Sequence, residues 1–233
     1  MNDTGQWRDV QAWMSARLEM RRHIWSLLGD VPPLFTPEVH IDSSVHHEVC
    51  MIHHFTFDNG ADALVYGLLL IPHGLSAPAP AMLVNHVHGH RYDLGKNQLI
   101  TAHHAHGYAD GIELARRGFV VMGIDAYAFG ERVHQGAAGE REHGAETEMS
   151  LFKQFLWQGR TLWGMMVRDD LLALAALIAR SEVDPARVGV TGMSLGGSRS
   201  TWLAAMDDRV ALAVVVSQMT RYADLLALGR LNL

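Results

Sequence analysis

The sequence has few of the features that mark secreted, membrane-bound or nucleic-acid-binding proteins. Its single cysteine, Cys50, excludes an internal disulfide framework and is compatible with a reducing compartment. The longest apolar runs, such as residues 171–179, are too short to span a bilayer, and residues 1–30 lack the uninterrupted apolar core of a signal peptide. The formal net charge of -6 leaves no basic footprint for nucleic acid. We therefore expect a cytoplasmic protein without a membrane or nucleic-acid partner.

Histidine is abundant in the chain, with 15 residues, but none follows Gly192-Met193-Ser194-Leu195-Gly196. This pentapeptide lies between an apolar strand-like run (187–191) and a helix-like run (195–206). Two glycines allow a sharp strand-to-helix turn that exposes the serine hydroxyl, which is the geometry of a nucleophile elbow. The alternative is a small-residue loop that only packs a helix against a strand.

The length of 233 residues suits one α/β domain with one sizeable core. Apolar residues at helical spacing predict a helix over 7–28, which Gly29 and the Pro32-Pro33 pair end. We therefore divide the chain into an N-terminal helical arm (1–33) and an α/β domain (34–233).

Strand and helix patterns alternate along the domain. A hairpin is predicted from 49–57 and 63–71, followed by strands at 81–87, 119–124, 187–191 and 211–216 and helices at 109–117, 157–180 and 195–206. This alternation predicts a doubly wound, mostly parallel sheet. The last strand is apolar throughout, as expected where both faces of a sheet are covered. The charged, glycine-bearing segment 131–149 is interpreted either as a lid or as a solvated connection.

Several motifs together resemble the α/β-hydrolase superfamily, in the branch of acetyl xylan esterase-like and dienelactone hydrolase-like proteins. They are His88-Gly89-His90, the segment 125–132 (DAYAFGER), the segment 183–188 (VDPARV), the extended elbow GMSLGG at 192–197, and the segment 207–210 (DDRV). The resemblance implies an α/β-hydrolase fold and a serine hydrolase that needs no cofactor. It also implies a small-molecule or carbohydrate-linked ester as substrate, for example an acetyl ester.

The same resemblance implies the roles of individual residues. Ser194 would be the nucleophile, and the backbone N–H of Leu195 would supply one oxyanion-hole donor. The backbone N–H of His90 would supply the other donor, with His88 and Gly89 supporting this loop.

No histidine follows Ser194 in the chain, although the α/β-hydrolase order places the triad acid and then the histidine after the serine. We expect both beyond Leu233, either because the chain lacks its C-terminal part or because another chain supplies it. The partner left open by the sequence is thus an accompanying C-terminal fragment or a second copy in a homo-oligomer. Within the chain, Asp224 is the alternative acid, ahead of Asp207 and Asp208, whereas Asp125 is expected to position the turn that follows it.

Two other functions remain open from the sequence. His86, His88 and His90 alternate, so a metal-dependent hydrolase could use them as ligands together with Asp93 or Asp125. The other reading is a non-catalytic binding module that keeps the elbow only for packing. The histidines at 103, 104 and 106 are interpreted as polar loop residues. Fluorophosphonate labelling would support the serine hydrolase, and chelator-sensitive turnover the metal-dependent enzyme.

Overall fold

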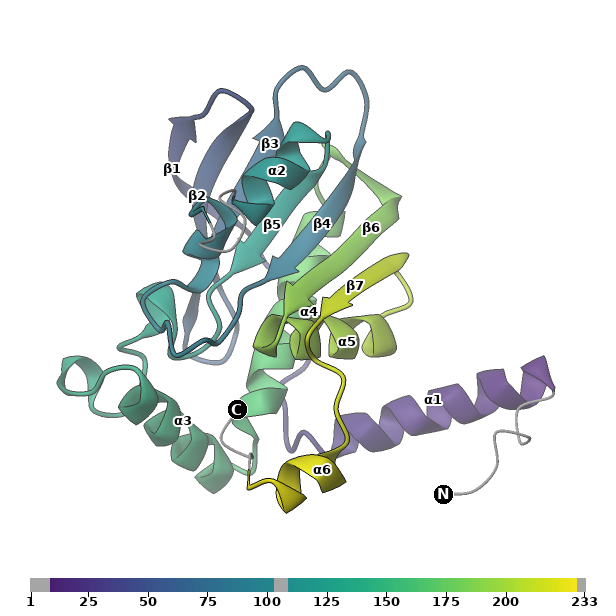
Figure 1. Ribbon diagram of the computed structural model, residues 1–233, viewed down its shortest axis with the longest axis vertical. Coiled ribbons are helices and arrows are strands. Elements are labelled where there is room, and N and C mark those ends of the chain that lie inside the picture. Colours follow the sequence, from purple (N-terminus) through teal and green to yellow (C-terminus); the bar gives the residue numbers. More distant parts are fainter. Residues whose placement is uncertain (1–8, 103–108, 230–233) are drawn as a thin grey trace.

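A seven-stranded mixed sheet forms the centre of the protein in this computed structural model, which describes residues 9–102 and 109–229. The strands lie in the order β1-β2-β3-β5-β4-β6-β7 (Figure 1). They are β1 (His40–His46), β2 (Cys50–Asp58), β3 (Leu64–Pro72), β4 (Ala79–Asn85), β5 (Val120–Ile124), β6 (Val183–Met193) and β7 (Leu212–Val216). The pairs β1–β2, β2–β3 and β3–β5 are antiparallel, whereas β5, β4, β6 and β7 run parallel to one another.

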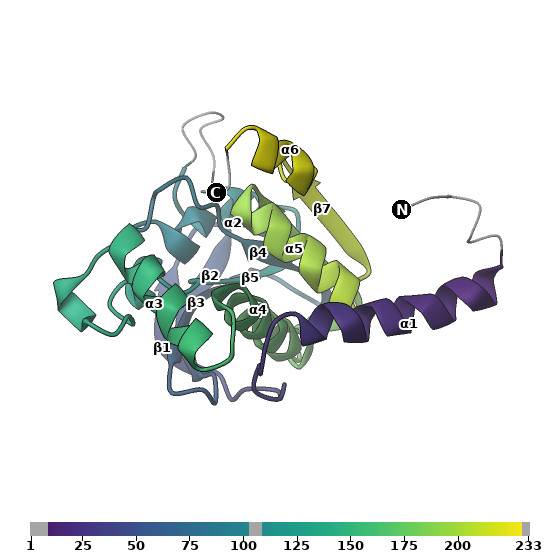
Figure 2. The same ribbon diagram turned by 90° about the horizontal axis from the view of Figure 1, so that it is seen from below.

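Helices cover both faces of the sheet. They are α1 (Val10–Ser26), α2 (Asp110–Arg116), α3 (Ala145–Trp157), α4 (Leu162–Ile178), α5 (Leu195–Met206) and α6 (Tyr222–Ala227), with short 3₁₀ turns η1 (Gly95–Leu99), η2 (Gly130–Arg132) and η3 (Gly139–Arg141). α4 and α5 lie on one face and α2 on the other (Figure 2). Each face has its own buried apolar core, represented by Leu83 and Leu172 toward α4 and by Leu70 and Ala115 toward α2. This is the doubly wound α/β arrangement that the alternating pattern predicted.

The helix predicted over 157–180 is wrong in its first part, because residues 158–161 separate the end of α3 from the start of α4 at Leu162. Thr161 begins α4: its hydroxyl accepts the N–H of Gly164 at 2.9 Å and donates to the carbonyl of Leu28 at 2.9 Å. Residues 145–157 instead form α3, which buries Leu151 and Phe155. The segment 131–149 contains most of η2, all of η3 and the first turn of α3, and most of its side chains are partly or fully exposed, so its interpretation as a lid or as a solvated connection stays a prediction.

The N-terminal helix α1 contacts the domain through Arg17, Arg21 and Trp25. Arg21 donates to Asp208 at 2.6 Å and to the carbonyl of Ala205, while Trp25 packs against the core beneath α4. None of its residues is buried, and Figures 1 and 2 show its first turns projecting from the body. The helix spans 10–26 of the predicted 7–28, and residues 1–8 lie outside the described part of the chain.

The two edge strands differ from the sequence analysis. β1 was not predicted, because its polar residues are all exposed and carry no period-2 apolar pattern; only pairing with β2 makes it a strand. β7 was predicted to be covered on both faces, but Leu212, Val214 and Val216 are each about half exposed. In the described part of the chain β7 pairs with β6 alone, so its apolar sequence indicates strand formation but not burial here. Among the described helices, none is long and apolar enough to cross a membrane.

Candidate active site

Ser194 lies where β6 ends and α5 begins, at the turn that the sequence predicted. Its backbone has φ 54° and ψ -118°, a conformation that side chains with a Cβ rarely adopt. The N–H of Ser194 donates to the carbonyl of Val216 at 2.9 Å, and its carbonyl accepts from the N–H of Ser198 at 2.9 Å. Neighbouring structure thus enforces the strained turn, and the Ser194 side chain is exposed.

The two elbow glycines allow backbones to approach each other closely. A Cβ on Gly196 would lie 2.1 Å from the carbonyl oxygen of Asn85, and one on Gly192 would lie 2.4 Å from the carbonyl carbon of Gly196. Only glycine fits at either position without a shift of the backbone. The elbow is therefore pressed against the end of β4, from which the His88-Gly89-His90 loop continues.

The loop after β4 turns sharply at two consecutive residues. Gly89 and His90 both have positive φ, at 50° and 54°. The backbone N–H of His90, one of the two predicted oxyanion donors, donates to Nδ1 of His88 at 3.1 Å. The other predicted donor, the N–H of Leu195, belongs to the first residue of α5, where an amide has no partner within its own helix. The structure thus brings the serine turn and the predicted donor loop to the same edge of the sheet.

His86 is a buried structural residue. Its Nε2 accepts the N–H of Ala126 at 3.0 Å, so the proton is on Nδ1, which donates to the carbonyl of Val87 at 2.8 Å. Burial, aided by the charge of Arg199, lowers the pKa of His86 to about 3. With both nitrogens engaged, His86 cannot join His88 and His90 in the predicted metal site. Among the described residues, no three His, Cys, Asp or Glu side chains are grouped to hold a metal ion.

The neutral, buried state of His86 makes the free energy of unfolding depend on pH. The imidazole takes up a proton near pH 6.5 in the unfolded chain but only near pH 3 in the folded protein. Stability should therefore fall as the pH drops below 6.5, by at most about 1.4 kcal/mol per pH unit from this group. We expect His86→Gln to show a weaker loss of stability between pH 7 and pH 5 than the wild type in urea unfolding. His40→Gln, at an exposed position, is the control; equal pH dependence in His86→Gln and wild type would contradict the prediction.

Asp125 holds the turn after β5, as the sequence predicted. Its buried carboxylate accepts the N–H of Lys96 at 2.7 Å and that of Glu131 at 3.0 Å, and it pairs with Nζ of Lys96 at 2.7 Å. A Cβ on Gly95 or Gly130 would lie within 2.3 Å of this carboxylate. Lys96 was missed because a single lysine in a loop has no distinguishing pattern.

The alternative in-chain acids are all paired with arginine. Asp224 of α6 accepts from Arg221 at 2.9 Å, and Asp207 accepts from Arg209 at 2.6 Å. Asp208 is engaged by the N-terminal helix through Arg21, as described above. These carboxylates have structural partners, and the loop histidines at 103, 104 and 106 lie outside the described residues.

Sequence analysis missed a polar cluster beside the donor loop. Glu148, in the first turn of α3, accepts the hydroxyl of Tyr92 at 2.7 Å and lies 3.3 Å from Nε2 of His88. The rings of Tyr92 and Phe129 stack with centroids 4.8 Å apart, and Leu195 packs against the same apolar cluster. No residue spacing signals this cluster, because it joins segments almost 60 residues apart.

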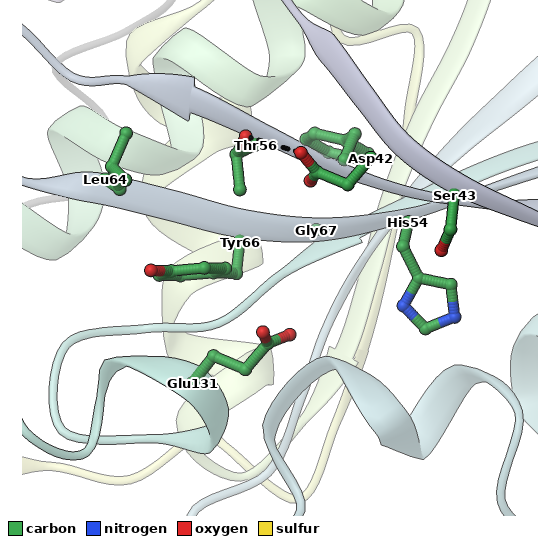
Figure 3. A pocket seen from close by; sticks show the side chains of 9 residues that line it. Asp42, Ser43, His54, Thr56, Leu64, Tyr66, Gly67 and Glu131 are labelled. Atoms are coloured by element: carbon green, nitrogen blue, oxygen red, sulfur yellow. Dashed lines mark hydrogen bonds between the residues drawn. The ribbon is translucent and has the colours of Figure 1, made fainter.

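A separate cavity of about 420 Å³ opens on the strands β1, β2 and β3 (Figure 3). Tyr66 and His54 project into it, and Glu131, which also pairs with Lys96 at 2.6 Å, lies at its rim. Its lining includes neither the serine turn nor the donor loop. We therefore keep this cavity apart from the candidate active site.

A serine on a strained strand-to-helix turn, at the carboxyl end of parallel strands covered by helices on both faces, defines an α/β hydrolase. Residues 96–218, more than half of the chain, match the model of the dienelactone hydrolase family, and the protein belongs to that family. It is 34% identical over 202 residues to a candidate hydrolase, YtaP, of Bacillus subtilis (strain 168), an alignment that covers 85% of this chain and 63% of the relative.

Solved structures with the same fold include two relevant neighbours. A candidate acetyl xylan esterase from Bacteroides fragilis superposes with a TM-score of 0.71 at 16% identity, covering 89% of this chain and 54% of the neighbour. Acetyl xylan esterase 1 from Thermoanaerobacterium sp. JW/SL YS485 gives a TM-score of 0.61 at 18% identity, covering 91% and 62%. Likeness at these identities shows the fold alone. The chain spans less than two thirds of the length of each of these relatives.

Proposed function

We propose that the protein is a carboxylic ester hydrolase that acts through an acyl-enzyme on Ser194. The observation that carries the proposal is that Ser194 combines a strained backbone conformation with an exposed side chain. Such strain persists only where the surrounding structure enforces it, and it gathers at functional sites. Family membership and acetyl xylan esterases among the structural neighbours support a small-molecule or carbohydrate-linked ester as the substrate.

In this proposal the Ser194 hydroxyl attacks the ester carbonyl while a base takes its proton. The oxyanion then accepts hydrogen bonds from the N–H groups of Leu195 and His90, the alcohol leaves, and water releases the acid from the acyl-enzyme. The Leu195 amide opens helix α5, whose dipole favours negative charge. The His90 amide already has an acceptor in His88, so the oxyanion would share or replace that bond.

We further propose that the base and the acid lie outside these 233 residues, since no histidine follows Ser194. Without a base, the oxyanion hole and binding alone leave roughly a thousandfold to ten-thousandfold acceleration over water. Residues 1–233, verified by intact mass, should therefore hydrolyse p-nitrophenyl acetate poorly compared with the same chain extended past Leu233. Full serine-dependent turnover by the verified 233 residues would contradict the placement and redirect the search to His88 and His90.

A further inference from the structure

The carboxylate of Glu148 ends a chain of hydrogen bonds that leads to the predicted donor loop. Glu148 lies 3.3 Å from Nε2 of His88, and Nδ1 of the same ring accepts the backbone N–H of His90 at 3.1 Å. Tyr92 donates its hydroxyl to the same Glu148 oxygen at 2.7 Å. One carboxylate on helix α3 is thus connected through one imidazole to the backbone of the loop.

The partners at the two ends of the His88 ring select one tautomer. Nδ1 must carry a lone pair to accept the His90 N–H, so in the neutral ring Nε2 carries the proton and donates it to Glu148. The opposite tautomer would set two donors against each other at Nδ1 and leave Glu148 facing a lone pair. Glu148 therefore favours the form of His88 that can hold the His90 amide.

The surroundings keep this arrangement in place. The His88 ring is 14% exposed and packs edge-on against Phe129 and Tyr92, with centroids 5.1 Å apart in each case. Burial would raise the pKa of Glu148, but hydrogen bonds from His88 and Tyr92 lower it below its ordinary value. Burial and the bond to Glu148 raise the pKa of Tyr92, so its hydroxyl stays a donor at neutral pH.

We propose that Glu148 is a positioning residue: through His88 it fixes the backbone of His90, the loop residue that would face the developing oxyanion. The consequence for catalysis rests on the proposed function, whereas the effect on His88 and His90 does not. The arrangement also couples helix α3 to the donor loop, because Glu148 is in the first turn of α3. A shift of α3 would then move the carboxylate and release the His90 amide.

The first test measures the coupling without any turnover. In ¹⁵N NMR of the whole chain, His88 should be the Nε2–H tautomer in the wild type and in Glu148→Gln, whose amide oxygen can still accept. In Glu148→Ala the tautomers should mix, and the His90 amide should exchange with solvent at least several-fold faster. Glu146→Ala, which removes an exposed glutamate from the same first turn, is the matched control and should change neither signal. An unchanged tautomer and unchanged exchange in Glu148→Ala would overturn the proposal.

The second test is kinetic and uses the chain extended past Leu233, which would contain the proposed base. Glu148→Ala should lower kcat by roughly tenfold with KM nearly unchanged, because a misplaced donor weakens transition-state binding. Glu148→Gln should recover most of this loss, and thermal unfolding of each variant checks its fold. A shifted tautomer with unchanged kcat would overturn the positioning role. Absence of esterase activity in every variant, wild type included, would instead defeat the proposed function and leave the NMR result standing.

Discussion

Ser194→Ala should remove nearly all ester hydrolysis, with kcat lower by roughly a thousandfold or more. The hydroxyl is the group that forms the acyl-enzyme, and no other nucleophile occupies the strained turn between β6 and α5. The measurement is p-nitrophenyl acetate hydrolysis by the chain extended past Leu233, with circular dichroism to confirm that the variant folds. A folded variant that retains more than a few per cent of wild-type kcat would show that Ser194 is not the nucleophile.

Ser198→Ala is the matched control for this prediction. Ser198 lies one turn further along α5 and is partly buried, and its bond to the serine turn is made by its backbone N–H, which alanine keeps. Its turnover should stay within about twofold of wild type, since the substitution removes no reacting group of the proposed mechanism. A loss in Ser198→Ala as large as in Ser194→Ala would point to disruption of the helix rather than loss of a nucleophile.

The largest effect on stability is expected at the ion pair between Asp170 of α4 and Arg199 of α5. Both side chains are fully buried, and Arg199 donates through Nε at 2.8 Å and Nη2 at 2.5 Å. Asp170→Ala would leave a buried guanidinium without its counter-charge, which costs about 3–5 kcal/mol. The free energy of unfolding from urea titration measures this loss.

The double variant Asp170→Leu/Arg199→Met separates charge from packing. Replacing both partners of a buried pair with apolar side chains of similar size is often close to neutral, so this variant should be clearly more stable than Asp170→Ala. If Asp170→Ala costs less than about 1 kcal/mol, or if the double variant is no more stable, the unpaired charge is not the source of the loss.

Residue patterns predicted the elements in which local chemistry and burial agree. α5 spans 195–206 as predicted, because the elbow glycines set its start. The hairpin of β2 and β3 also formed, because Asp58-Asn59-Gly60 makes a turn between alternating strands. The break before α4 was missed because Thr161 begins that helix through a contact with Leu28, which is more than 130 residues away. Such a contact has no local signature.

In the candidate site, too, the sequence predicted the features that local chemistry requires and missed those that depend on distant contacts. The location of Ser194 and its turn could be predicted. The backbone at the end of β6, the start of α5 and the end of β4 approach so closely that only glycine fits, and the two glycines are visible in the sequence. The role of Asp125 could be predicted in outline but its partner Lys96 could not. The Glu148 cluster could not be predicted at all, because its members come from a loop and a helix that only folding brings together. His86 was weighed as a metal ligand because alternation shows which side chains share a face, but not which hydrogen bonds occupy their nitrogens.

The most direct test of the central claim is to trap and map the reactive serine. The chain extended past Leu233 is treated with a fluorophosphonate probe, and its intact mass is measured. It is then digested so that the modified residue can be located by mass spectrometry. The account predicts one adduct per chain, on Ser194, with hydrolysis lost in proportion to labelling and no adduct in Ser194→Ala. An adduct on another residue, or hydrolysis that survives complete labelling of Ser194, would contradict it.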